Sequence, residues 1–236
     1  MVIERFKVEK ENPQSLMDTK KLLTECLGTF TLIFIGVGAS AITGNLIAIG
    51  FAYGFTVLAL IYAFGDISGM HINPAVTIGL AVGGKIDGPT AGGYIIAQLL
   101  GGVLGAITLA AVIGFPEQAG DLGNTILANN PDTFVISQFQ GFIVEMILTF
   151  LLVSTIYHTS FSGKPETMAP LAIGAMLTAL IFVGLPLTGA SLNPARTLGP
   201  AIVSATVYPW GQLWIYILGP IAGGVLASVV HKALRD

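Results

Sequence analysis

Apolar residues dominate six long stretches of the chain, and shorter segments with charged residues, glycine or proline separate them. The stretches cover residues 20–42, 48–66, 91–114, 134–157, 168–187 and 211–232. A helix needs about 20 apolar residues to cross a bilayer. The pattern therefore predicts six membrane-spanning helices, and an even number of crossings places both ends of the chain on one side of the membrane.

Composition and charge support a membrane location. Hydrophobic residues make up 53% of the 236 residues and charged residues only 10%, against about 25% charged in ordinary globular domains. The net charge of −3 offers no basic footprint for a nucleic acid. Basic residues gather at both ends of the chain and at Lys85 and Lys164. The positive-inside rule therefore predicts a multi-pass plasma-membrane protein with cytoplasmic termini, residues 1–19 forming a cytoplasmic tail.

The second half of the chain repeats the first. The tripeptide Asn-Pro-Ala occurs at 73–75 and again at 193–195, and Glu25 recurs as Glu145 at the same interval of 120 residues. Each half supplies three crossings, an odd number, so the two copies are expected to be inverted relative to one another. We expect one membrane domain over 1–236, with the first repeat at 20–114 and the second at 134–232.

A short apolar segment follows each tripeptide, at 74–82 and at 194–203. Asparagine followed by proline is typical of a helix start. At about 1.5 Å per residue these segments are too short to cross a bilayer. They are predicted to be re-entrant half-helices that enter from opposite faces and meet at the midplane. Non-helical backbone at that depth must line a polar cavity or be enclosed, and the loop residues expected there are Gly69, Met70, His71, Gly189 and Ser191.

Asn73 and Asn193 are the main candidates for function, because each begins a half-helix at the midplane. Each side-chain oxygen is expected to cap its own half-helix, which leaves the amide NH₂ as a donor aimed into the cavity. Two donors and two positive helix ends would turn back cations and interrupt a proton wire, whereas water passes with its oxygen toward them. The plainer alternative is a pair of caps that touch no ligand.

These features together resemble the aquaporins of the major intrinsic protein family over the full length of the chain, most of all the archaeal members. The resemblance rests on both tripeptides, the run at 68–71, the run at 193–197 and the paired glutamates. It implies an all-α membrane protein with six transmembrane helices and two half-helices. It also implies a passive channel for water and small uncharged solutes such as glycerol, no enzymatic activity, no metal or cofactor, and a homotetramer in lipid.

The resemblance further implies a selectivity filter beside the Asn pair, formed by Tyr53, Ile181, Ala190 and Arg196. Strict water channels usually place Phe, His and a small residue at the first three positions, and glycerol channels pair bulky aromatics with Gly. This set matches neither pattern. Ile181 in place of His makes the ring less polar, and the Tyr53 hydroxyl is expected to fill part of the gap. Arg196 is also a candidate in its own right, because a cation inside the membrane is costly.

The remaining ionisable groups have two readings each. Glu25 and Glu145 are either a proton-coupling pair or acceptors for backbone N–H groups of the re-entrant loops, and their repeat symmetry favours the structural role. His71 either responds to pH or bonds to the loop. His158 and His231 are expected to be solvated at the cytoplasmic ends of their spans. Three alternatives to a water channel stay open: a glycerol or small-solute facilitator with low water flux, an ion-coupled transporter, and a non-conducting structural protein.

Overall fold

The computed structural model describes residues 18–114, 120–161, 166–204, 206 and 208–235. This part of the chain is helical, apart from loops and one isolated bridge between Asn129 and Val135. The helices are α1 (Thr19–Leu32), the π-helical η1 (Ile33–Val37), α2 (Gly38–Ile42), α3 (Leu46–Ser68), α4 (Pro74–Val82), α5 (Gly88–Ile113), α6 (Gln138–Ser160), the 3₁₀ turn η2 (Glu166–Met168), α7 (Ala169–Thr188), α8 (Pro194–Val203), the 3₁₀ turn η3 (Trp210–Gln212) and α9 (Leu213–Arg235).

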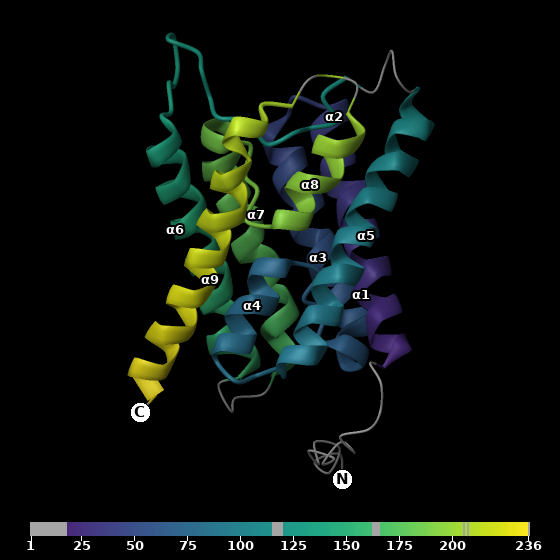
Figure 1. Ribbon diagram of the computed structural model, residues 1–236, viewed down its shortest axis with the longest axis vertical. Helices are drawn as coiled ribbons and strands as arrows, with labels where there is room; N and C mark the ends of the chain where they lie inside the picture. The colour runs from purple at the N-terminus through teal and green to yellow at the C-terminus, as the bar shows by residue number, and fades with distance from the viewer. Residues whose placement is uncertain (1–17, 115–119, 162–165, 205, 207, 236) are drawn as a thin grey trace.

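Among the described residues, six helices are long and apolar enough to cross a membrane, which confirms the six predicted spans. The first of them runs without a break through α1, η1 and α2. The half-helices α4 and α8 have the bounds that the sequence predicts. In Figure 1 the start of α1 and the end of α9 lie at the same end of the bundle. The half-helix α4 lies in that half of the bundle, and α8 lies in the opposite half.

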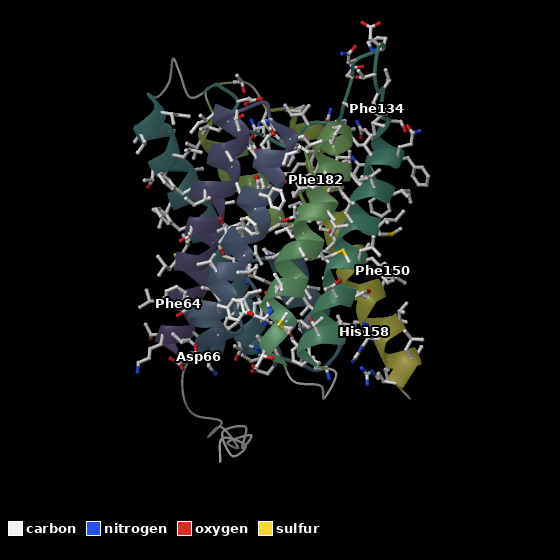
Figure 2. All side chains as sticks on the ribbon, turned by 180° about the vertical axis from the view of Figure 1, so that it is seen from behind. Phe64, Asp66, Phe134, Phe150, His158 and Phe182 are labelled. Atoms are coloured by element: carbon white, nitrogen blue, oxygen red, sulfur yellow. The ribbon has the colours of Figure 1, made fainter. Side chains whose placement is uncertain are left out.

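The fourth span begins at Gln138 rather than at 134. Ser137 and Gln140 form a reciprocal capping box, in which each side chain accepts a hydrogen bond from the other residue's backbone N–H. Such a box fixes a helix start more strongly than hydrophobicity does. Phe134 therefore lies before the helix, at the end of the bundle opposite Asp66 and His158 (Figure 2).

Burial is reversed relative to a water-soluble protein. Large apolar side chains such as Leu27, Phe55 and Val183 are about half exposed on the outside of the bundle. Polar side chains such as Glu25 and Glu145 are completely buried inside it. A surface of this kind suits hydrocarbon, and a polar interior has to be satisfied by hydrogen bonds within the protein.

Each half-helix packs against the last long helix of the opposite repeat, α4 against α9 and α8 against α5. Glycines allow these close approaches. A Cβ atom on Gly224 of α9 would lie 2.5 Å from the carbonyl oxygen of Ala75, and one on Gly102 of α5 would lie 2.8 Å from that of Ala195. The two contacts occupy corresponding places in the two halves, so the inverted repeat extends to the packing of the backbones.

The expectation that His231 is solvated is wrong. Its side chain is only 8% exposed, and its ring stacks on Tyr157 with centroids 4.4 Å apart. His158 is half-buried and meets the His231 ring at a steep angle, with centroids 5.1 Å apart. The cause is the packing of α6 on α9, helped by the Tyr157 hydroxyl, which donates to the carbonyl oxygen of Gly79 in α4 at 2.8 Å.

The cross-repeat glycine contact can be tested with Gly224→Ala. The added methyl group would meet backbone of α4, which cannot rotate away. We expect a loss of about 1–3 kcal/mol, the usual cost of overpacking, seen as a lower thermal unfolding midpoint in detergent. Gly92→Ala on α5 is the matched control, because nothing lies within 4 Å of its Cβ position. An unchanged midpoint for Gly224→Ala would contradict the packing described.

Candidate functional site

Asn73 and Asn193 begin the two half-helices and cap them. The Asn73 Oδ1 atom accepts hydrogen bonds from the backbone N–H groups of Ala75 and Val76, at 2.8 and 3.5 Å. The Asn193 Oδ1 atom accepts from Ala195 and Arg196, at 2.9 and 3.4 Å. Proline follows each asparagine at the first helical position, where its missing N–H is not needed. The two starts therefore have the same geometry.

The two asparagines are also joined across the repeats. The Nδ2 atom of Asn73 donates to the carbonyl oxygen of Leu192 at 2.8 Å, and that of Asn193 donates to the carbonyl oxygen of Ile72 at 2.9 Å. Our expectation had the whole NH₂ group facing a cavity. Since each amide has two N–H bonds, this exchange leaves one N–H per asparagine for another partner.

The loops before the two asparagines adopt an unusual backbone. Left-handed φ values occur at matching positions of the two loops: Gly69, Met70 and Ile72 in one, and Gly189, Ala190 and Leu192 in the other. Left-handed conformations of non-glycine residues cost of order 1–3 kcal/mol each and persist only where surrounding contacts impose them. Contacts with residues outside the loops must therefore hold the loop backbone in this conformation.

Glu25 of α1 holds the first loop. Its Oε1 atom accepts from the Ser68 hydroxyl at 2.7 Å and from the His71 N–H at 2.9 Å. Its Oε2 atom accepts from the Ile72 N–H at 2.7 Å and from the Gln98 side chain at 2.8 Å. The carboxylate thus takes up loop N–H groups that have no helical partner.

Glu145 of α6 does the same for the second loop. It accepts from the Thr188 hydroxyl at 2.7 Å and from the N–H groups of Ser191 and Leu192 at 2.9 and 2.8 Å. The Tyr216 hydroxyl donates to the Thr188 carbonyl oxygen at 3.0 Å. The first half has the same arrangement, as an inverted repeat requires: the Ser68 hydroxyl donates to Glu25, and a tyrosine hydroxyl donates to the Ser68 carbonyl oxygen.

The halves differ behind the half-helices. In the first half Gln98 bridges Glu25 and the Thr77 hydroxyl, and the His71 ring bonds to the same hydroxyl through Nδ1 at 3.2 Å. The residue that corresponds to Gln98 in the second half is Pro220, which has no side-chain donor. The repeat marks Thr77, which recurs as Thr197, but nothing in the sequence singles out Gln98, because its partners Glu25 and Thr77 come from other helices.

A chain of hydroxyl groups replaces that bridge in the second half. The Ser191 hydroxyl lies 2.7 Å from that of Thr197, and Thr197 lies 2.9 Å from Thr125, which comes from the segment between α5 and α6. Ser191 also donates to the Asn193 carbonyl oxygen at 3.0 Å. Tyr208, beyond α8, lies beside Thr125 without a well-formed hydrogen bond to it, and burial raises the pKa of Tyr208 to about 12, so its phenol is neutral at physiological pH.

The four residues of the expected filter come from three helices and a loop and are nearly inaccessible. Tyr53 on α3 is 2% exposed, and Ile181 on α7, Ala190 in the second loop and Arg196 on α8 are each 1% exposed. Tyr53, Ile181 and Ala190 belong to one apolar cluster. The Arg196 guanidinium lies 5.6 Å from the centre of the Tyr53 ring. The fold therefore brings an aromatic ring and a cation face to face beside apolar walls.

Backbone carbonyls hold Arg196. Its Nη1 atom donates to the Gly123 carbonyl oxygen at 2.8 Å, and Nη2 to that of Gly189 at 3.5 Å. Its Nε atom is buried without a partner among the described residues. Gly123 lies in the long segment between α5 and α6, which we expected to be an outer loop. Its neighbour Leu122 is fully buried, so this segment folds inward and forms part of the site.

The Tyr53 hydroxyl lies beside Ser40 of α2, without a well-formed hydrogen bond to it. That it fills part of the gap beside Arg196 stays a prediction. The ring packs against Gly36 of the π-helical turn η1. Tyr53 thus packs against the wall formed by η1 and α2.

Glu145→Gln tests the support of the second loop. One carboxylate oxygen becomes an NH₂ group that faces a backbone N–H of Ser191 or Leu192, so one buried donor loses its acceptor. We expect a loss of about 1–3 kcal/mol, measured as a lower thermal midpoint. Asp87→Asn is the matched control, because that exposed carboxylate caps α5 and asparagine caps equally well. Equal midpoints for the two variants would contradict the role of Glu145.

Comparison with known proteins agrees with this architecture. The family model for the major intrinsic protein family matches residues 12–231. The chain is 43% identical to the glycerol uptake facilitator protein-like 6 of Lactiplantibacillus plantarum, over 91% of this chain and 98% of that protein. It is 38% identical to aquaporin AqpM of Methanothermobacter marburgensis, with 92% and 98% covered. The structure of the aquaglyceroporin from Plasmodium falciparum superposes with a TM-score of 0.79 at 27% identity, over 92% of this chain and 97% of that one. This chain therefore belongs to the major intrinsic protein family.

Proposed function

We propose that the chain forms a passive transmembrane channel for water and small uncharged solutes such as glycerol, and that it excludes ions and protons. Members of this family are channels rather than enzymes. The names of the relatives refer to both water and glycerol, since one is called an aquaporin and another a glycerol uptake facilitator. Their identity extends over nearly the whole chain.

The observation that carries the proposal is the head-to-head pairing of Asn73 and Asn193. Each asparagine donates one side-chain N–H to a carbonyl oxygen of the opposite loop and retains a second N–H. The positive ends of α4 and α8 lie behind the two amides. A molecule that passes between them meets two donors and no acceptor, which suits the oxygen of water or of an alcohol and repels a cation. We assign these two residues to the central constriction, and Gly69, Met70, His71, Gly189 and Ser191 to the loop backbone that lines the path on either side.

We assign the selectivity filter to Tyr53, Ile181, Ala190 and Arg196. Arg196 supplies the polar side, and its buried Nε–H is available to a passing oxygen atom. Ile181 and Ala190 supply an apolar side that makes no hydrogen bonds. A ring that is half polar and half apolar fits a molecule such as glycerol, which has hydroxyl groups and a carbon backbone, and it also admits water.

The environment of Glu25 and Glu145 argues against an ion-coupled carrier. Their oxygens already accept hydrogen bonds from loop N–H groups and hydroxyls. Protonation in a transport cycle would weaken these bonds and release the strained loops. We therefore assign both residues to loop support.

The membrane placement and the assembly follow from the charges and the outer surface. We infer a plasma-membrane protein with both termini in the cytoplasm, because Lys20, Lys21, Lys232 and Arg235 lie at the start of α1 and the end of α9, which share one end of the bundle. The outer surface is apolar, as contact with lipid or with other copies requires. We infer a homotetramer, in keeping with the resemblance to aquaporins.

Flux measurements on proteoliposomes test the function. We expect vesicles that contain the protein to shrink faster than empty vesicles in an osmotic gradient, to take up glycerol, and to carry no ion current. Glycerol uptake without faster shrinkage would favour a facilitator with low water flux. Unchanged shrinkage and uptake with folded protein would exclude a channel of either kind.

Ile181→His tests the filter. The imidazole adds a hydrogen-bonding group to the apolar side of the filter. It also reduces the apolar surface that contacts the carbon backbone of glycerol. We expect the ratio of glycerol to water flux to fall about fivefold, the factor that corresponds to about 1 kcal/mol for one such group. Ile181→Leu, which keeps the wall apolar, serves as the control. An unchanged ratio for Ile181→His would place residue 181 outside the filter.

A further inference from the structure

The first membrane span contains a π-helical turn at Ile33–Val37, where Ile33, Gly36 and Val37 are buried. Short π-helical turns are rare and occur often at functional sites. The sequence of this turn has no proline and reads as ordinary apolar helix. Its effect therefore depends on the side chains that pack against this turn.

The ring of Tyr53 packs directly on Gly36. A Cβ atom at Gly36 would lie 2.5 Å from Cε1, 2.6 Å from Cδ1 and 2.9 Å from Cζ of Tyr53. These distances are up to about 0.9 Å short of the 3.4 Å at which ordinary van der Waals contact begins. The ring is 2% exposed, and the Arg196 guanidinium faces it at 5.6 Å. A side chain at Gly36 would therefore displace a closely packed ring that lies next to Arg196.

The same wall also supports Arg196. A Cβ atom at Gly123 would lie 2.8 Å from Cβ of Ser40 and 3.3 Å from the carbonyl oxygen of Val37. Gly123 is the residue whose carbonyl oxygen accepts the 2.8 Å bond from Arg196. Both polar members of the filter thus rest on residues 36–40, Tyr53 directly and Arg196 through Gly123.

We propose that the wall at residues 36–40 sets the aperture of the filter, meaning the gap between the Tyr53 ring and the Arg196 guanidinium, and that Gly36 is the positioning residue that keeps it open. The absence of a side chain at Gly36 lets the ring lie back against η1 and so widens the gap to the Arg196 guanidinium. This inference rests on the proposed roles of Tyr53 and Arg196 in the filter.

Gly36→Ala is the direct test. The added methyl group pushes the ring toward Arg196, so glycerol flux should fall by about tenfold and water flux by a smaller factor. Gly50→Ala is the matched control. A Cβ atom there would also meet an aromatic ring, that of Phe182, but Phe182 lies on the outer face of α3 and α7 beside an open groove (Figure 2). We expect the control to keep both fluxes.

Tyr53→Leu completes the test, because it removes the ring on which Gly36 acts. We expect Tyr53→Leu to raise the ratio of glycerol to water flux, and the double variant with Gly36→Ala to behave like Tyr53→Leu alone. If Gly36→Ala does not fold, a folded double variant with that behaviour still supports the contact, and a double variant that also fails to fold overturns it.

Three results separate the possible failures. Unchanged flux in folded Gly36→Ala, or an equal loss with and without the Tyr53 ring, overturns the role of Gly36 and leaves the channel intact. An unchanged flux ratio in Tyr53→Leu overturns the assignment of Tyr53 to the filter and this inference with it. An absence of flux in the unmodified protein overturns the proposed function itself.

Discussion

Backbone polar groups at mid-membrane depth have no water to bond with, and this constraint governs the centre of the molecule. The loops at 69–72 and 189–192 break the helical pattern there. Their N–H groups are satisfied by two buried carboxylates, Glu25 and Glu145, and two of their carbonyl groups by Asn73 and Asn193. Without these acceptors the left-handed residues of the loops would have nothing to hold them, and the half-helices could not meet.

The inverted repeat makes the centre symmetric, and departures from it make the two mouths different. The residue that corresponds to Arg196 in the first half is Val76, and those that correspond to Tyr53 and Ala190 are Ile173 and Met70. The ring that mirrors the proposed filter on the other side of the midplane is therefore apolar and has no cation. The residues assigned to discrimination thus lie on one side of the midplane only, whereas both repeats carry the scaffold.

Local signals predicted much of this structure. The Asn-Pro starts of α4 and α8 depend on neighbouring residues alone, so their bounds were predictable to the residue. The contacts that complete the site are not local. The burial of His231 depends on how α6 meets α9, and the support of Arg196 comes from Gly123, in a segment whose polar composition resembles any outer loop. The π-helical turn also escapes prediction, because its sequence reads as ordinary apolar helix.

The exchange of half-helices between repeats bears on how the protein is made. When α4 leaves the ribosome, α9 and the carbonyl group of Leu192 that receives its Asn73 amide have not been synthesised. The first three spans can insert in order and already offer α4 and the loop before it contacts from α5 and Glu25, but the helix against which α4 mainly packs is made last. Final packing of α4 is thus a late step of biogenesis, and a chain that stops before α9 lacks that surface.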